Sequence, residues 1–287
     1  MQLKEALHEG VSRLSAENVP SPRMNAELLL IFTLSCDRAY LFAHPERDLT
    51  PEEESRYEAA LSERARGVPA QYITGHQEFW GMDLIVSPAV LIPRPETEHV
   101  VETVLDLVKT QTVPARKTRT NLRIVDVGTG SGGIALALAK QLPQAEIHAI
   151  DISSAALEIA RANAARLQIE GRIIFHQGDL LQGLAGEFDF VVSNPPYVGE
   201  SEQDQVQLEV RKFEPRGAVF AGPNGTEVIE RLIPQAKLAL RPEGWLVLEI
   251  SGTIVDPVRA LMTGWNDIDV LPDLQSIPRV VRARKPL

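Results

Sequence analysis

Hydrophobic positions in the C-terminal two thirds of the chain follow two alternating patterns. Short apolar runs rich in β-branched residues occur at 122–127, 146–150, 173–176, 188–193 and 244–250. Amphipathic runs with helical spacing separate most of them, at 132–141, 153–167 and 226–240. Strands that alternate with helices in this way form a mostly parallel sheet covered on both faces. We therefore predict an α/β fold in this part, with ligands bound beyond the carboxyl ends of its strands.

The N-terminal part shows helical spacing instead. Apolar residues recur every three or four positions through 3–14, and Thr50 with Glu53 has the spacing of a capping box at a helix start. We predict a helical bundle at 1–68 with a role in substrate recognition, an extended or hairpin linker at 69–95 stiffened by prolines, and an α/β domain at 96–287. That domain should open with a helix from Glu96 to about Lys109, followed by a polar stretch to Thr120.

Composition narrows the class of protein. The 287 residues include 44% hydrophobic and 24% charged residues, which is ordinary for a globular protein, and the net charge of −10 does not favour direct nucleic-acid binding. A protein partner is favoured instead, either basic or bound to RNA. The single cysteine, Cys36, rules out an internal disulfide, and no Cys/His cluster has metal-ligand spacing. The first residues carry no signal-peptide pattern and no apolar run is long enough to span a bilayer, so we expect a cytoplasmic protein without a membrane partner.

A glycine-rich turn follows the apolar run at 122–127. From Asp126 to Gly133 the chain reads Asp-Val-Gly-Thr-Gly-Ser-Gly-Gly. Glycines permit positive φ and let a ligand approach the backbone closely. The spacing Gly128-x-Gly130-x-x-Gly133 also satisfies the dinucleotide fingerprint, so the turn predicts a nucleoside-containing ligand without distinguishing its class.

Two aspartates follow the next two apolar runs. Asp151 lies 23 residues after Gly128 and is suited to accept hydrogen bonds from ribose hydroxyls, although it could also cap the helix that begins near Ser153. Asp179 could accept a hydrogen bond from an adenine amino group, or it could be a solvated turn residue.

The run at 188–193 ends in Asn194-Pro195-Pro196-Tyr197. Proline fixes its own φ and holds the preceding residue extended. The Asn194 side-chain oxygen and the Pro195 carbonyl could then converge on one planar –NH₂ group, with Tyr197 packed against it. This arrangement is typical of a site that methylates an amide or an exocyclic amine. The alternative is a simple Asn-Pro turn.

With these motifs the chain resembles class I S-adenosylmethionine-dependent methyltransferases, and more narrowly the PrmC/HemK family. The resemblance extends over nearly the whole length and rests on the segments at 75–81, 91–98, 126–133, 194–197, 213–215 and 222–225. The segment at 91–98, Leu-Ile-Pro-Arg-Pro-Glu-Thr-Glu, is the most specific of them. The family implies a Rossmann-like domain with a mostly parallel seven-stranded sheet, preceded by a small helical bundle.

The resemblance also implies residue roles. The cofactor, S-adenosylmethionine, would be bound by Gly128, Thr129, Gly130, Ser131, Gly132, Asp151, Asp179, Leu180 and Asn194. The substrate would be bound by Asn194, Pro195, Pro196 and Tyr197, of which Asn194, Pro195 and Tyr197 would be catalytic. Leu180 stands where some relatives carry an aromatic residue, and 222–226 departs from the Gly-x-Asp-Gly-Leu pattern. Arg94 and Glu96 would contact either the substrate or another domain.

The implied activity is methylation of the glutamine side chain of the Gly-Gly-Gln motif in peptide chain release factors. Positioning and electrostatic stabilisation would suffice for this transfer, so none of the six histidines is expected to be catalytic. Two alternatives stay open: a nucleic-acid amine methyltransferase acting on adenine-N6 or guanine-N2, and a non-catalytic cofactor-binding module. A nicotinamide-dependent enzyme is disfavoured, because it has no use for Asn-Pro-Pro-Tyr beside its nicotinamide.

Overall fold

The computed structural model describes residues 1–110, 122–184 and 186–287, and these form two compact units. The first consists of Met1–His76 with Gln207–Phe213, and the second of Gln77–Val206 with Glu214–Leu287. The polar stretch that we predicted up to Thr120 lies outside the described residues, apart from its first position.

The first unit is built from helices. They are α1 (Leu3–Ala16), α2 (Pro22–Leu34), α3 (Arg38–Ala43), α4 (Pro51–Ala65), α5 (Ala70–Thr74) and α9 (Leu208–Phe213). The predicted capping box is present at the start of α4, where Thr50 and Glu53 exchange side-chain and backbone hydrogen bonds. Apolar side chains spaced along α1, α2 and α4 form the core, which includes the buried Tyr57 ring. Its hydroxyl donates to the Ala26 carbonyl at 3.2 Å.

The units divide at different points from those predicted at residues 68 and 95. Helix α5 packs against α2 and α4, so the first unit continues to His76. Helix α9, far along the chain, also belongs to this unit, and its Glu209 forms an ion pair with the buried Arg64 at 2.9 Å. Nothing in the local pattern of 208–213 indicates this membership, because it depends on one long-range ion pair and on packing.

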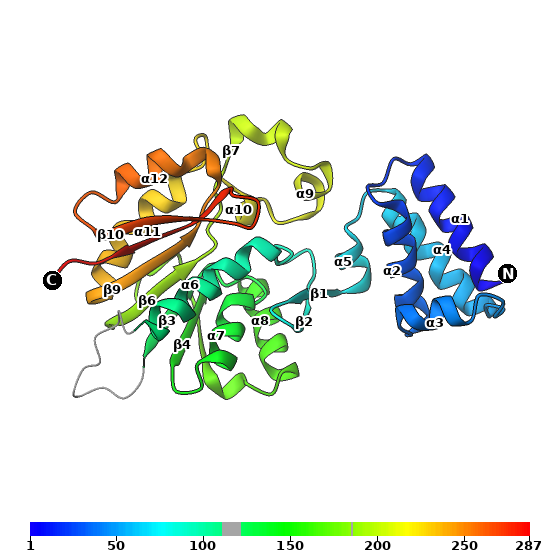
Figure 1. The fold of residues 1–287 in the computed structure, drawn as a ribbon, viewed down its shortest axis with the longest axis horizontal. Coiled ribbons are helices and arrows are strands. Elements are labelled where there is room, and N and C mark those ends of the chain that lie inside the picture. The colour runs from blue at the N-terminus through cyan, green and yellow to red at the C-terminus, as the bar shows by residue number, and fades with distance from the viewer. Residues whose placement is uncertain (111–121, 185) are drawn as a thin grey trace. The chain divides into compact units, whose positions relative to one another are not determined.

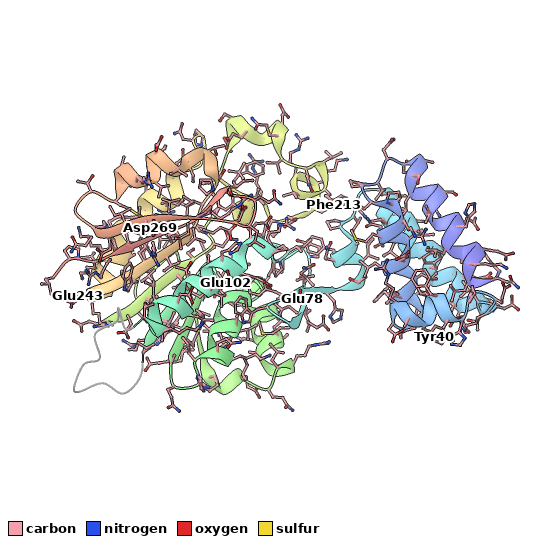
Figure 2. The ribbon with its side chains drawn as sticks, in the orientation of Figure 1. Tyr40, Glu78, Glu102, Phe213, Glu243 and Asp269 are labelled. Atoms are coloured by element: carbon pink, nitrogen blue, oxygen red, sulfur yellow. The ribbon has the colours of Figure 1, made fainter. Side chains whose placement is uncertain are left out.

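A two-stranded sheet of β1 (His76–Phe79) and β2 (Met82–Ile85) lies inside the predicted linker range. Trp80 and Gly81 both have positive φ, the conformation of a tight two-residue hairpin turn. The Glu78 side chain, labelled in Figure 2, accepts a hydrogen bond from the Gly81 N–H at 2.6 Å and so closes the turn.

The second unit contains the predicted sheet. Its seven strands lie in the order β10-β11-β9-β6-β3-β4-β5. Their bounds are β3 (Arg123–Val127), β4 (Glu146–Asp151), β5 (Ile173–Gln177), β6 (Phe188–Ser193), β9 (Leu240–Glu249), β10 (Asn266–Pro272) and β11 (Pro278–Arg284). The pairs from β9 to β5 are parallel, and β11 pairs antiparallel with both β9 and β10. The predicted mostly parallel seven-stranded fold is confirmed.

Helices cover both faces of this sheet (Figure 1). One face is covered by α6 (Glu98–Lys109), α7 (Gly133–Gln141) and α8 (Ser154–Arg166), and the other by α11 (Glu227–Ala239) and α12 (Val255–Leu261). Side chains of β3 alternate between the two cores: Ile124 belongs to one core and Val125 to the other. The polar residues at the carboxyl ends of β3, β4 and β6 border the site.

The remaining elements are short. They are 3₁₀ turns at Pro95–Thr97, Glu170–Arg172, Glu200–Gln205 and Gly252–Ile254, helix α10 (Arg216–Val219), and the paired strands β7 (Val198–Gly199) and β8 (Phe220–Gly222). Strand β7 begins directly after Tyr197, so its pairing with β8 anchors the chain that leaves the Asn-Pro-Pro-Tyr segment.

Candidate active site

The carboxyl ends of β3, β4 and β6 meet at the point where the strand order reverses. Strand β3 lies between β4 and β6 and is parallel to both. The Ser193 hydroxyl at the end of β6 donates to the Val127 carbonyl at 2.6 Å, and the Gly128 N–H donates to the Ile150 carbonyl at 2.8 Å. These bonds join the ends of three strands at the position where sheets of this type bind ligands.

A cavity of about 420 Å³ lies beyond these strand ends. The predicted site residues that line it are Gly128, Thr129, Gly130, Ser131, Asp151, Asp179, Leu180, Asn194 and Pro196. Gly132, Pro195 and Tyr197 are not among the lining residues. The structure therefore brings most of the predicted site together, although the residues come from four separate loops.

The glycine turn combines two functions. A Cβ atom at Gly128 or Gly130 would meet nothing within 4 Å, so the backbone there borders open space that a ligand can enter. Gly132 instead begins α7 with a φ of 90°, and a Cβ atom there would meet Leu136 at 3.0 Å and Ala160 at 3.3 Å. The first two glycines thus border the cavity, and Gly132 permits close packing of α7.

Asp151 is held by backbone groups on both sides. Its Oδ2 accepts from the Gly130 N–H and its Oδ1 from the Ser153 N–H, each at 2.9 Å. The N-cap of α8 is Ser153, whose hydroxyl accepts from the Ala156 N–H, so Asp151 does not have the capping role considered above. A carboxylate has about four acceptor positions, so Asp151 retains capacity for a ligand that donates two hydroxyl hydrogen bonds.

Asp126 is a buried acid beneath the glycine turn. Its Oδ2 accepts from the Thr129 hydroxyl at 2.6 Å and from the Ala135 N–H at 3.2 Å. Burial raises the pKa of this carboxyl to about 7, and the nearby Asp151 adds to the effect. The sequence places Asp126 at a strand end. The fold shows in addition that its carboxyl binds both the glycine turn, through Thr129, and the start of α7, through Ala135.

Asp179 and Leu180 follow β5 and line the cavity next to a cation. Asp179 forms an ion pair with Arg231 of α11, which also lines the cavity. Leu180 has a φ of 55°, an uncommon left-handed conformation for a leucine, and packs against the core beneath α11. The sequence reasoning missed Arg231, because nothing local to position 231 relates it to Asp179.

Ile152 was also missed. It follows Asp151, lines the cavity and is 68% exposed, although it is a large apolar side chain. The sequence signal that could have identified Ile152 is an apolar residue directly after the acid at the strand end. Its side chain offers an apolar surface against which a nucleobase can pack.

Asn194 is tied to the segment at 91–98. Its Nδ2 donates to the Thr97 hydroxyl at 3.0 Å, and both residues line the cavity. The Tyr197 hydroxyl donates to Glu249 Oε1 at 3.0 Å. Burial, together with Glu249, raises the pKa of Tyr197, so the phenol stays protonated and remains a donor.

Arg94 binds within the second unit. It forms an ion pair with Glu214, which also accepts the Ile92 N–H at 3.1 Å, and all three residues belong to the second unit. Glu98 accepts the Trp80 N–H at 2.7 Å. The segment at 91–98 therefore contacts the hairpin, Asn194 and Glu214, and so connects these three parts at the edge of the cavity.

The family models and relatives agree with this architecture. The model of the PrmC N-terminal domain matches residues 5–75, and that of the methyltransferase small domain matches residues 107–212. The release factor glutamine methyltransferase of Koribacter versatilis is 53% identical over 288 residues, covering 100% of this chain and 99% of that protein. The chain belongs to the release factor glutamine methyltransferase family.

Other members of this family match at lower identity. The release factor glutamine methyltransferase of Moorella thermoacetica is 43% identical, with 95% of each chain covered, and that of Deinococcus radiodurans is 37% identical, with 99% of each covered. The identity extends through both units, as the PrmC/HemK resemblance predicted.

Solved structures share the fold. A methyltransferase from Pyrococcus furiosus superimposes with a TM-score of 0.52 at 19% identity, covering 81% of this chain and 100% of that chain. The human METTL16 catalytic domain, in complex with a MAT2A 3′UTR hairpin, has a TM-score of 0.56 at 16% identity, covering 80% and 81%. These likenesses confirm the class I methyltransferase fold. Within the described residues, the helices are too short or too polar to cross a membrane.

Proposed function

We propose that this protein transfers a methyl group from S-adenosylmethionine to the side-chain amide nitrogen, N5, of the glutamine in the Gly-Gly-Gln motif of peptide chain release factors. The observation that carries the proposal is the position of Asn194. It lines the same cavity as the glycine turn and Asp151, and its amide nitrogen is already bound to Thr97. The relatives that match over the whole chain are named for this activity.

The cavity fits the cofactor. Asp151 retains acceptors for a ribose diol, and the open backbone of Gly128 and Gly130 permits close approach of the cofactor. Ile152 and Leu180 supply apolar surface for an adenine, and Asp179 supplies an acceptor for its amino group. When bound, S-adenosylmethionine supplies an electrophilic methyl group on a sulfonium centre.

The chain's own residues position the acceptor nitrogen. An amide nitrogen is a weak nucleophile, because its lone pair is delocalised into the carbonyl. With Nδ2 of Asn194 bound to Thr97, Oδ1 is left to accept one N–H of the glutamine amide. Acceptance of the other N–H by the Pro195 carbonyl stays a prediction, because Pro195 is not among the lining residues. These acceptors aim the nitrogen and stabilise the positive charge that develops on it. The nitrogen becomes acidic only as the methyl group arrives, so no strong base is required beforehand.

Tyr197 contributes to this arrangement from the protein core rather than from the cavity wall. Its ring packs against the core under α11 and its hydroxyl is bound to Glu249, and it is not a lining residue. Packing of Tyr197 against the substrate amide stays a prediction. The observed contacts support a role in fixing the backbone that carries Asn194 and Pro195.

The helical unit is proposed to recognise the release factor outside its Gly-Gly-Gln motif. Met24, Leu28 and Phe32 recur every four residues along α2 and are 65%, 38% and 40% exposed. Large apolar side chains aligned on one exposed helix face are typical of a protein-binding surface. The proposed site of action is the cytoplasm, where release factors work.

The proposal is tested by incubating the purified protein with radiolabelled S-adenosylmethionine and a release factor. The control is the same factor with its Gly-Gly-Gln glutamine replaced, and DNA and ribosomal RNA are tested in parallel. Label on the intact factor and none on the control is the expected result. Label on nucleic acid alone would contradict the proposal and favour the amine methyltransferase alternative.

A further inference from the structure

Helix α8 carries one polar side chain on its buried face. The buried residues of this helix are Ala156, Leu157, Ala160, Asn163 and Ala164, and Asn163 is 0% exposed. Asparagine lowers helix stability relative to alanine, and burial of its amide costs free energy unless the polar atoms find partners. The other four positions are apolar, so packing alone does not require an amide at position 163. Its presence indicates contacts that an apolar side chain could not make.

Both polar atoms of the Asn163 side chain bind the backbone of other segments. Oδ1 accepts from the Ile85 N–H at 2.6 Å, and Nδ2 donates to the Ile85 carbonyl at 3.0 Å. Nδ2 also donates to the Ser131 carbonyl at 2.9 Å. These partners fix the orientation of the amide, because a backbone N–H requires the oxygen and the two carbonyls require the nitrogen. Asn163 therefore joins the end of β2 to the glycine turn.

The bond to Ser131 holds the glycine turn. Ser131 lines the cavity and is only 4% exposed. It precedes Gly132, the N-cap of α7, so its carbonyl lies outside the hydrogen-bond ladder of that helix and needs another partner. Asn163 supplies that partner from α8. The glycine turn is thus held at this point as well as through the bond between Gly130 and Asp151.

The bonds to Ile85 hold another part of the cavity wall. Ile85 ends β2, and residues 86–93, which follow it, form no helix or strand. The residues among them that line the cavity are Ala89, Val90, Leu91 and Pro93. A segment without regular secondary structure depends on other contacts for its position. Asn163 binds both backbone groups of Ile85 at one end of this segment, and Glu214 accepts the Ile92 N–H near the other.

We propose that Asn163 is a positioning residue for S-adenosylmethionine, which fixes the spacing between the glycine turn and residues 86–93 at the width that the cofactor requires. Asn163 is not among the lining residues, so it acts through the two segments that are. Without its amide, both segments can shift in the ligand-free protein, and binding must then restore their spacing at a cost in free energy. This inference rests on the proposed location of S-adenosylmethionine in the cavity and does not depend on which group is methylated.

Two substitutions remove the contacts of Asn163 in different ways. Asn163→Ala removes all three hydrogen bonds and keeps a residue that favours a helix. Asn163→Asp keeps the shape of the side chain and the acceptor for Ile85, but it loses the donors to Ile85 and Ser131. The Kd for S-adenosylmethionine, measured by isothermal titration calorimetry, is expected to rise about 5- to 30-fold in each variant. The second variant preserves the shape of the helix face where truncation to alanine impairs folding.

Asn25→Ala is the matched control. Asn25 is 8% exposed in the first unit, and its amide also makes three hydrogen bonds. Nδ2 donates to the carbonyls of Pro20 and Ser21 at 2.8 and 3.1 Å, and Oδ1 accepts from Nε of Arg64 at 2.7 Å. The substitution removes the same atoms from a unit whose residues do not line the cavity, so the Kd should equal that of wild type. Thermal unfolding of each variant shows that the Kd is measured on folded protein.

A second measurement uses the protein without cofactor. Amide hydrogen exchange at Ile85, followed by ¹H–¹⁵N NMR, should be faster than wild type in Asn163→Ala, which lacks the acceptor. It should stay at the wild-type rate in Asn25→Ala and close to that rate in Asn163→Asp, which keeps the acceptor. Unchanged exchange at Ile85 in Asn163→Ala would show that the amide does not hold this segment and would overturn the inference.

The binding data decide between the remaining outcomes. A wild-type Kd in both Asn163 variants, or an equal rise in Asn25→Ala, would overturn the inference. If Asp151→Ala also left the Kd unchanged, the proposed location of the cofactor would fail with it. A wild-type protein that binds S-adenosylmethionine but does not methylate release factors would overturn the proposed function alone, and the Kd values of the Asn163 variants would still decide the inference.

Discussion

The Oδ2 atom of Asp151 accepts a hydrogen bond from the backbone N–H of Gly130 at 2.9 Å. This bond joins the last residue of β4 to the glycine turn after β3, and β3 and β4 are neighbouring parallel strands. The carboxylate is therefore oriented before any ligand binds, and a preoriented acceptor lowers the entropic cost of binding.

Replacement of Asp151 by alanine should weaken cofactor binding. Asp151→Ala removes charge-assisted hydrogen bonds to a ribose diol, so we expect the Kd for S-adenosylmethionine to rise about tenfold or more, measured by isothermal titration calorimetry. Ser153→Ala is the control, because Ser153 lines the same cavity and the substitution removes only its hydroxyl, while the backbone N–H that binds Asp151 is retained. An unchanged Kd in Asp151→Ala would limit this residue to its bonds with the backbone.

Removal of the Asn194 side chain should abolish turnover and leave the fold intact. Asn194→Ala deletes the acceptor for the substrate N–H, and loss of one such group costs about 100- to 1,000-fold in kcat. The thermal unfolding midpoint should stay near the wild-type value. Asn224→Ala, in the turn at 222–226, is the control. Near-normal kcat in Asn194→Ala would contradict the proposed mechanism.

Local patterns were sufficient to predict the parts of the site that lie at strand ends. The apolar run at 188–193 matches β6, and the runs before Gly128 and Asp151 match β3 and β4 to within one residue. Parallel strands place their carboxyl ends at one edge of the sheet, so the positions of Gly128, Asp151 and Asn194 follow from the alternation alone.

The contacts that orient these residues could not be predicted in the same way. Thr97 and Asn194 are 97 positions apart, and Tyr197 and Glu249 are 52 apart. Such pairs depend on how distant segments pack against one another, and the hydrophobic periodicity of the sequence does not predict that packing. The edge strand β10 was also not identified individually, because its exposed and half-buried residues do not form a continuous apolar run.

The buried carboxyl of Asp126 should make stability depend on pH. Burial raises its pKa from 3.8 to about 7 in the folded protein, so between about pH 4 and pH 7 the unfolded chain has released a proton that the folded protein still holds. Stability from this group is therefore present at low pH and is lost as the pH rises, by up to about 1.4 kcal/mol per pH unit. Asp126→Asn removes the titration.

The wild type and Asp126→Asn should therefore differ in how their free energies of unfolding depend on pH. In urea unfolding between pH 5 and pH 7, the wild type should lose more stability with rising pH than Asp126→Asn. All other titrating groups are shared, so their contributions cancel in the difference. Parallel profiles would show that Asp126 titrates well below this range.

The apolar face of α2 should affect recognition of the whole release factor but not the chemistry. Leu28→Ser or Phe32→Ser removes apolar contact area from the proposed surface, so we expect KM for a full-length release factor to rise about 5- to 30-fold, which corresponds to 1–2 kcal/mol. KM for a short peptide that contains Gly-Gly-Gln should not change, because such a peptide occupies only the cavity. Steady-state kinetics with the two substrates separates these effects.

Leu238→Ser is the matched control for these substitutions. Leu238 is 85% exposed on α11 of the second unit, so its replacement removes a similar apolar side chain from a surface with no proposed role. Its KM values for both substrates should equal those of wild type. An equal rise in KM for protein and peptide in the α2 variants, or the same rise in Leu238→Ser, would show that recognition does not use this face of α2.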